Sequence, residues 1–175
     1  MGDVESIGIG WRLSSLSGWG VYGSNLAREL LHLRRNPVLL APPHRLDLEA
    51  GLRDALEPAF RRQKDLQEFL DKVGQMEFDF PVLHSLRNGF EPALEYQIAR
   101  GSRNIGVIFF EDTDISKAAL ARAREYDLII TGSTWNKEIL EAHGLTHVVN
   151  VFQGIDADLF CPYTDDCGLS DPYPG

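Results

Sequence analysis

The sequence predicts one α/β domain, a Rossmann-like, mostly parallel sheet with helices on both faces. Three observations favour this fold class. Short apolar runs alternate with segments of helical period along residues 6–152. The runs are continuously apolar, which is typical of strands covered on both faces. The chain has 175 residues, of which 43% are hydrophobic, so it can bury roughly 70% of its unfolded surface without a disulfide or a metal.

The first half of the chain predicts two strands and two helices. A strand over residues 6–13 runs into a serine-rich loop, and apolar residues then recur at helical spacing over residues 21–33. Two arginines and Asn36-Pro37 predict the end of this helix. A second strand follows over residues 38–41 and ends at two prolines. Residues 47–76 carry one helical apolar stripe, and Glu57-Pro58 predicts that this helix has two segments.

The second half repeats the alternation of strand and helix. Strands are predicted over residues 80–84, 105–110, 127–131 and 148–152, and helices over residues 92–99, 116–125 and 135–142. After residue 160 the chain is polar, contains three prolines and shows no periodicity. We therefore expect a domain over residues 1–160 and a linker or tail over residues 161–175.

Charge and composition exclude several classes of partner. The chain has 17 basic and 26 acidic residues, a formal net charge of -9, so its field repels nucleic acid and anionic lipid. No apolar stretch reaches the ~18 residues of a membrane span, and no leader pattern follows Met1. We expect a cytoplasmic protein without nucleic-acid partners or stable membrane insertion. Cys161 and Cys167 lack nearby ligand partners, so we expect free thiols, with a tail disulfide as the alternative, and no zinc site.

A glycine-rich segment, residues 18–23, has the spacing G-x-G-x-x-G of a dinucleotide-binding motif. It begins several residues beyond the predicted strand, and the second strand ends in Ala41-Pro42-Pro43 instead of the acid that holds a ribose. Two other interpretations remain open. The segment is either a loop that presents backbone N–H groups to a polar or anionic ligand, with Trp19 and Tyr22 as stacking surfaces, or a tight turn with packed aromatic residues.

Carboxylates follow the strand over residues 105–110, where ligands bind in parallel sheets. Glu111 and Asp112 are candidates for a general base, for hydrogen bonds to sugar hydroxyls or for metal binding. Asp114 is expected to cap the next helix instead. His84, at the end of the third strand, is either a general base or ligand donor or a structural histidine.

The segment 132–136 joins the fifth strand to its helix, where Ser133 or Thr134 can cap the helix and offer a hydroxyl to a cleft. The motifs of serine hydrolases, P-loop NTPases, zincins and thiol oxidoreductases are missing from the sequence. These enzyme classes are therefore set aside.

Three segments in the same order resemble the N-terminal half of family-four GT-B glycosyltransferases. They are residues 17–23, residues 131–136 and the Gln153-Gly154-Ile155-Asp156 segment before Phe160-Cys161-Pro162. The resemblance covers residues 5–162 and implies a domain that binds the acceptor and faces a second, donor-binding domain. It implies that the glycine segment approaches the donor phosphates and sugar, and that Gln153, Gly154 and Asp156 form the hinge. Glu111 stands where many members have a histidine, and a glutamate cannot donate a hydrogen bond as that histidine does.

The hypothesis is therefore half of a retaining glycosyltransferase, nearly inactive without a nucleotide-sugar-binding domain encoded downstream or supplied in trans. Its co-substrates are a nucleotide-sugar and a sugar or glycoconjugate acceptor, with no cofactor and no metal. The predicted catalytic residues are Glu111 and Asp112, and the predicted substrate-binding residues are Ser17, Gly18, Trp19, Gly20, Tyr22, His84, Ser133, Trp135 and Asn136. The alternatives are an NAD(P)-dependent oxidoreductase domain that uses Gly18, Gly20 and Gly23, and a non-enzymatic sugar-binding module that forms a homodimer.

Overall fold

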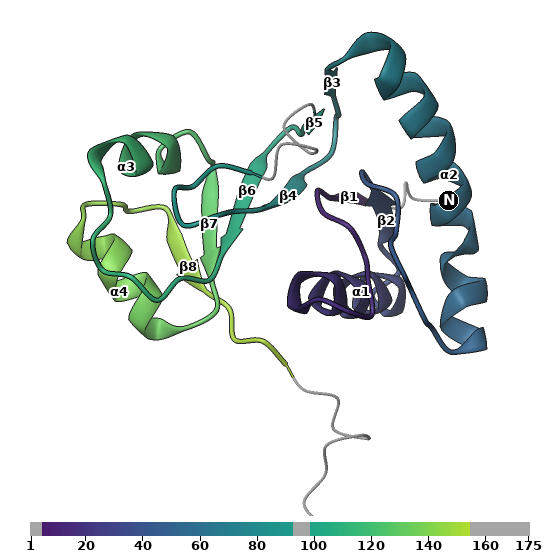
Figure 1. Cartoon of the computed structure of the whole chain (residues 1–175), viewed down its shortest axis with the longest axis horizontal. Coiled ribbons are helices and arrows are strands. Elements are labelled where there is room, and N and C mark those ends of the chain that lie inside the picture. Colours follow the sequence, from purple (N-terminus) through teal and green to yellow (C-terminus); the bar gives the residue numbers. More distant parts are fainter. Residues whose placement is uncertain (1–4, 93–98, 155–175) are drawn as a thin grey trace, which may run out of the picture.

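The structure is a computed structural model and describes residues 5–92 and 99–154. Its helices are α1 (Gly18–His32), α2 (Ala50–Val73), α3 (Lys117–Ala123) and α4 (Thr134–Ala142). Its strands are β1 (Ser6–Ile9), β2 (Asn36–Leu39), β3 (Met76–Glu77), β4 (Val82–Ser85), β5 (Ala99–Arg100), β6 (Asn104–Ile108), β7 (Leu128–Thr131) and β8 (Val148–Asn150). Figure 1 shows their arrangement, with the sheet crossing the middle of the molecule.

The main sheet has six strands in the order β2-β1-β4-β6-β7-β8. Every pair of neighbouring strands is parallel. The predicted fold class, a Rossmann-like α/β domain, is confirmed. The chain passes from β1 to β2 on one side and then to β4 on the other side of β1, so the strand order reverses between β1 and β4. In open parallel sheets, such a reversal opens a crevice at the carboxyl ends of the strands.

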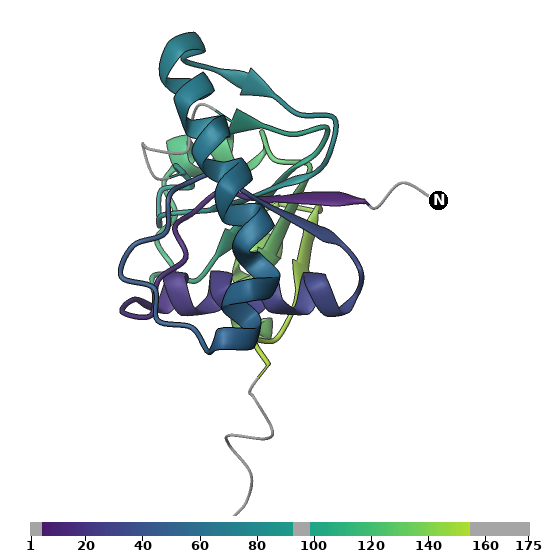
Figure 2. The same cartoon turned by 90° about the vertical axis from the view of Figure 1, so that its right-hand side faces the viewer.

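Helices cover both faces of the sheet (Figures 1 and 2). Alternate strand residues point to opposite faces, and Val107 and Ile108 illustrate this. Val107 belongs to the core beneath α1 and the first part of α2, whereas Ile108 belongs to the core beneath α3 and α4. A smaller third core forms around Val38, Leu40, Val82 and Ala99. The continuous apolar runs in the sequence arise from this burial on both faces.

Helix α2 is continuous, so the prediction of two segments is wrong. Pro58 lies inside the helix and is exposed to solvent. A proline in a helix interior lacks a backbone donor and costs about 3 kcal/mol. On either side of it, Leu56 and Ala59 are at most 6% exposed and belong to the main core. The burial of these side chains on the same helical stripe offsets the cost of the proline.

Two further differences concern the region between β4 and β6. The sequence did not predict β3 and β5, which form a separate two-stranded parallel sheet. The helix predicted over residues 92–99 is wrong at both ends, because Pro92 forms an antiparallel bridge with Leu86 and Ala99 belongs to β5. Residues 93–98 lie outside the described residues, as do Asp156, Cys161, Cys167 and the predicted tail. In the described part of the chain, no helix is both long and apolar enough to cross a bilayer.

Candidate functional site

The start of α1 lies near the carboxyl end of the sheet and differs from the loop predicted there. The helix begins at Gly18, and the hydroxyl of Ser17 caps it by accepting a hydrogen bond from the N–H of Gly20 at 3.1 Å. The glycine segment 18–23 is therefore the first part of a helix, and the prediction of a loop is wrong. Ser17 and Gly18 are exposed, so the helix start is open to solvent.

Two of the three motif glycines allow close packing inside the molecule. A Cβ atom on Gly20 would lie 2.7 Å from the backbone nitrogen of Ser14, and one on Gly23 would lie 2.5 Å from Nε1 of Trp11. A Cβ atom on Gly18 would meet nothing within 4 Å. The packing interpretation of this segment therefore holds for Gly20 and Gly23, although they lie in a helix and not in a turn.

Aromatic side chains connect the start of α1 to the end of β6. The indole of Trp11 is 2% exposed, donates a hydrogen bond to the carbonyl oxygen of Trp19 at 2.9 Å and stacks on Tyr22 with ring centroids 5.9 Å apart. Phe109 follows β6 and packs against Trp19 and Tyr22 at 5.1 and 5.9 Å between centroids. Trp19 and Tyr22 are thus half-buried members of this aromatic cluster.

The predicted catalytic carboxylates lie just beyond this cluster. Glu111 and Asp112 are exposed at the carboxyl end of β6. An oxygen of the Asp112 carboxylate accepts a hydrogen bond from the N–H of Asp114 at 2.9 Å and holds the local turn. Asp114 does not cap α3. Ser116 does, because its hydroxyl accepts a hydrogen bond from the N–H of Ala119, so that prediction is wrong.

The start of α4 completes this edge of the sheet. Of the two predicted caps, Ser133 and Thr134, Ser133 caps the helix and accepts a hydrogen bond from the N–H of Asn136 at 3.1 Å. Asn136 is 5% exposed, and its side-chain amide donates a hydrogen bond to the carbonyl oxygen of Phe110 at 2.7 Å. Trp135 is 43% exposed and lies against Phe110 with ring centroids 5.9 Å apart. The residue before Glu111 is therefore fixed to α4 by a hydrogen bond and a ring contact.

The structure thus brings together three of the predicted segments, the start of α1, the end of β6 and the start of α4. We name this set of residues, 17–22, 109–112 and 133–136, the carboxyl-edge site. It offers two exposed carboxylates, a half-exposed indole and the open first turn of α1. Carboxylates accept hydrogen bonds from hydroxyl groups, and an indole offers an apolar face. The combination suits a polyhydroxylated ligand.

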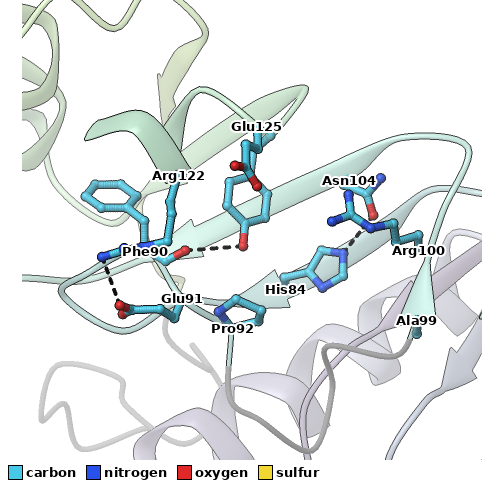
Figure 3. Close-up of a pocket in the computed structure, with 10 residues that line it drawn as sticks. His84, Phe90, Glu91, Pro92, Ala99, Arg100, Asn104, Arg122 and Glu125 are labelled. Atoms are coloured by element: carbon cyan, nitrogen blue, oxygen red, sulfur yellow. Dashed lines mark hydrogen bonds and ion pairs between the residues drawn. The ribbon is translucent and has the colours of Figure 1, made fainter. Parts of the chain in front are cut away.

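His84 does not belong to this site. Leu83 points toward the core beneath α1, so its neighbour His84 points to the opposite face of the sheet. There His84 lines a cavity of about 290 Å³, together with Phe90, Glu91, Pro92, Ala99, Arg100, Asn104, Arg122, Glu125 and Tyr126 (Figure 3). Of the predicted site residues, His84 alone lines this cavity among the residues that the structure describes.

Burial and one hydrogen bond fix the state of His84. The side chain is 5% exposed, and its Nε2 atom lies 3.0 Å from Oδ1 of Asn104, which also accepts from the N–H of Gly101. Because a carbonyl oxygen only accepts, Nε2 carries the proton. Burial lowers the pKa of His84, the positive charge of Arg100 lowers it further, and the hydrogen bond to Asn104 opposes both effects. At neutral pH the imidazole is therefore uncharged.

The other residues of the cavity were not found from the sequence. Arg100, Asn104 and Arg122 come from β5, β6 and α3, Tyr126 follows α3, and no motif relates their positions. Their proximity depends on the pairing of β4 with β6 and on the packing of α3 on the sheet.

Of the predicted hinge residues, Gln153 and Gly154 are exposed at the end of the described chain, beyond β8. Among the described ranges 5–92 and 99–154, no group of three or more His, Cys, Asp or Glu side chains is placed to hold a metal ion. Comparisons with protein-family models, curated proteins and solved structures found no match. The resemblance to family-four glycosyltransferases therefore rests on the sequence motifs.

Proposed function

We propose that this chain is the acceptor-side domain of a retaining glycosyltransferase that resembles family four. It binds a sugar or glycoconjugate acceptor at the carboxyl-edge site, and a second domain, downstream or in trans, supplies the nucleotide-sugar. The observation that carries the proposal is the convergence of the start of α1, the end of β6 and the start of α4. The contacts of Phe109 with Trp19 and of Asn136 with Phe110 hold these three segments together.

The chemistry of glycosyl transfer explains why one domain is insufficient. The donor and acceptor must be held in attack geometry while the charge of the departing diphosphate is neutralised. The carboxyl-edge site contributes Glu111 and Asp112, which carry negative charge and repel a diphosphate. These carboxylates suit acceptor hydroxyls, and the cationic groups must come from the opposing domain.

The arrangement of the glycine motif weighs against a dinucleotide cofactor. In dinucleotide-binding folds the motif forms the turn directly after the first strand. Here residues 10–17 separate β1 from Gly18, and Gly20 and Gly23 contact Ser14 and Trp11. No acidic residue stands at the end of β2, where Leu40 and Ala41 are buried.

The test is thermal unfolding of this chain with a panel of mono- and oligosaccharides, UDP-, GDP- and ADP-sugars, and NAD(P)(H). A saccharide at about 100 times its dissociation constant stabilises the fold by roughly 2.7 kcal/mol, or several degrees. We expect a saturable shift with particular saccharides that is lost in Glu111→Gln and Asp112→Asn. The control is Glu68→Gln, which removes the same charge from an exposed position on α2.

Each outcome decides between the hypotheses. A saturable shift with NAD or NADP would replace the glycosyltransferase proposal with the dinucleotide one. A saccharide shift that depends on Glu111 but accompanies a concentration-dependent dimer would favour the non-enzymatic module. Equal saccharide shifts in the wild type, Glu111→Gln and Asp112→Asn would remove the carboxyl-edge site from acceptor binding.

A further inference from the structure

Two of the charged side chains that line the cavity around His84 are exposed and have no hydrogen-bond or ion-pair partner among the described residues. Among these residues, four charged side chains line the cavity. Arg122 is held by an ion pair with Glu91 at 2.8 Å and by a hydrogen bond to the carbonyl oxygen of Gly89 at 2.7 Å. Within the described residues, the side chains of Arg100 and Glu125 form neither an ion pair nor a hydrogen bond. Among the described residues of the cavity, one positive and one negative charge are thus unmatched.

Both unmatched charges act on the pKa of Tyr126, another residue that lines the cavity. Burial raises the pKa of Tyr126 to about 12, while the positive charge of Arg100 lowers that pKa and the negative charge of Glu125 raises it. The hydroxyl itself donates to the carbonyl oxygen of Phe90 at 3.3 Å. In Figure 3, Arg100 lies beside His84 at one end of the cavity, and Arg122 and Glu91 lie at the other end.

The remaining surface of the cavity is neutral and partly apolar. The imidazole of His84 is uncharged and engaged with Asn104, and its ring lies edge-on to that of Tyr126 with centroids 6.0 Å apart. Phe90 and Pro92 add apolar surface. Of the residues that the structure describes, a ligand here meets the unpaired side chains of Arg100 and Glu125 and an aromatic wall, in a volume at the small end of ligand pockets.

We propose that this cavity binds a small zwitterion of amino-acid size. Arg100 receives its carboxylate, Glu125 receives its ammonium group, and the ring of Tyr126 contacts its carbon skeleton. A guanidinium suits a carboxylate because its N–H donors match the two oxygens. A ligand with both charges is favoured over an anion, because an anion would leave Glu125 without a counter-charge, whereas Glu91 is already paired with Arg122. The site is separate from the carboxyl-edge site and does not depend on glycosyl transfer.

The experiment is calorimetric titration of this chain with a panel of free L-amino acids, with glucose and inorganic phosphate as competing ligand classes. The amino acid that binds best is then compared with its amide, which lacks the carboxylate, and its N-acetyl derivative, which lacks the ammonium charge. We expect each derivative to bind the wild type at least about tenfold more weakly, because each loses one charge-assisted contact.

Variants connect each charge of the ligand to its residue. In Arg100→Gln, the dissociation constants of the amino acid and its amide should agree within about twofold. In Glu125→Gln, the dissociation constants of the amino acid and its N-acetyl derivative should agree within about twofold. The controls are Arg124→Gln and Glu138→Gln, which carry the same changes at exposed positions that do not line the cavity. They should bind the amino acid as the wild type does.

Three results would overturn the inference. They are the lack of saturable binding by every amino acid, binding of glucose or phosphate instead, and equal binding of the amino acid and both derivatives to the wild type. Glu111→Gln leaves the cavity unchanged and tests only the carboxyl-edge site. The proposed function and the zwitterion site can therefore fail independently of each other.

Discussion

The side-chain amide of Asn136 donates a hydrogen bond to the backbone carbonyl oxygen of Phe110 at 2.7 Å. This contact joins the first turn of α4 to the residue before Glu111. The amide oxygen of the same side chain accepts from the hydroxyl of Ser133 at 2.9 Å. The buried Asn136 thus connects Ser133, the cap of α4, to Phe110, the residue before the predicted catalytic Glu111.

Replacing Asn136 with alanine should destabilise the fold. The carbonyl oxygen of Phe110 would lose its partner in a buried place, and the half-buried hydroxyl of Ser133 would also lose one. An unsatisfied buried polar group costs about 1–3 kcal/mol. The free energy of unfolding in urea measures the effect. Asn25→Ala is the control, because its hydrogen bond to the carbonyl oxygen of Val21 is exposed, and it should change stability by less than about 0.5 kcal/mol.

The two glycines at the start of α1 should respond differently to alanine. Gly20→Ala places a Cβ atom 2.4 Å from Cβ of Ser14 and 2.7 Å from its backbone, so overpacking should cost about 1–3 kcal/mol. Gly18→Ala meets nothing within 4 Å and should be neutral or stabilising by at most about 1 kcal/mol. Denaturant unfolding of both variants provides the comparison, and equal stabilities would contradict the packing role of Gly20.

The cap of α4 should contribute measurably to stability. Ser133→Ala removes the oxygen that accepts from the N–H of Asn136, and the loss of such a cap costs about 0.5–2 kcal/mol. The neighbouring Thr134→Ala is the control, since Thr134 is exposed and its hydroxyl has no hydrogen bond within the described residues. If both variants unfold at the same urea concentration, Ser133 is not the effective cap.

The stability of the fold should decrease when the pH falls below neutral, partly because of His84. Its pKa is lowered in the folded state, so the unfolded chain binds a proton first as the pH decreases. Stability therefore declines from the unfolded pKa of about 6.5 down to the folded pKa and is constant below it with respect to this group. The slope is measured from the free energy of unfolding at a series of pH values between about 7.5 and about 5.

His84→Gln removes this titration and should flatten the slope. The glutamine variant has its own baseline stability, so only the change with pH is compared. His44→Gln is the control, because His44 is exposed and its ring forms no hydrogen bond or ion pair within the described residues. A slope that is the same in the wild type and in His84→Gln would show that protonation of His84 does not limit stability.

Local sequence patterns predict most of the helices and strands of the main sheet, whereas contacts between distant segments decide the features that these patterns miss. Continuous apolar runs predicted the six strands of the main sheet, and helical spacing predicted α1, α3 and α4. These patterns are local, because each strand or helix shows in its own sequence which faces are buried. Ser133 was found as a cap for the same reason, since a cap contacts a residue three positions away. The sequence does not distinguish Asp114 from Ser116 as the cap of α3, because both residue types accept hydrogen bonds from backbone N–H groups.

The sequence alone therefore determined the fold class, the order along the chain of the six strands of the main sheet and the segments that lie at the carboxyl ends of these strands. Only the tertiary structure decided that α2 continues through Pro58, because burial of Leu56 and Ala59 outweighs the local cost of the proline. It also decided that Gly20 and Gly23 lie in a packed helix and that His84 faces Arg100 and Tyr126. These features depend on contacts between segments far apart in the chain, which no local pattern encodes.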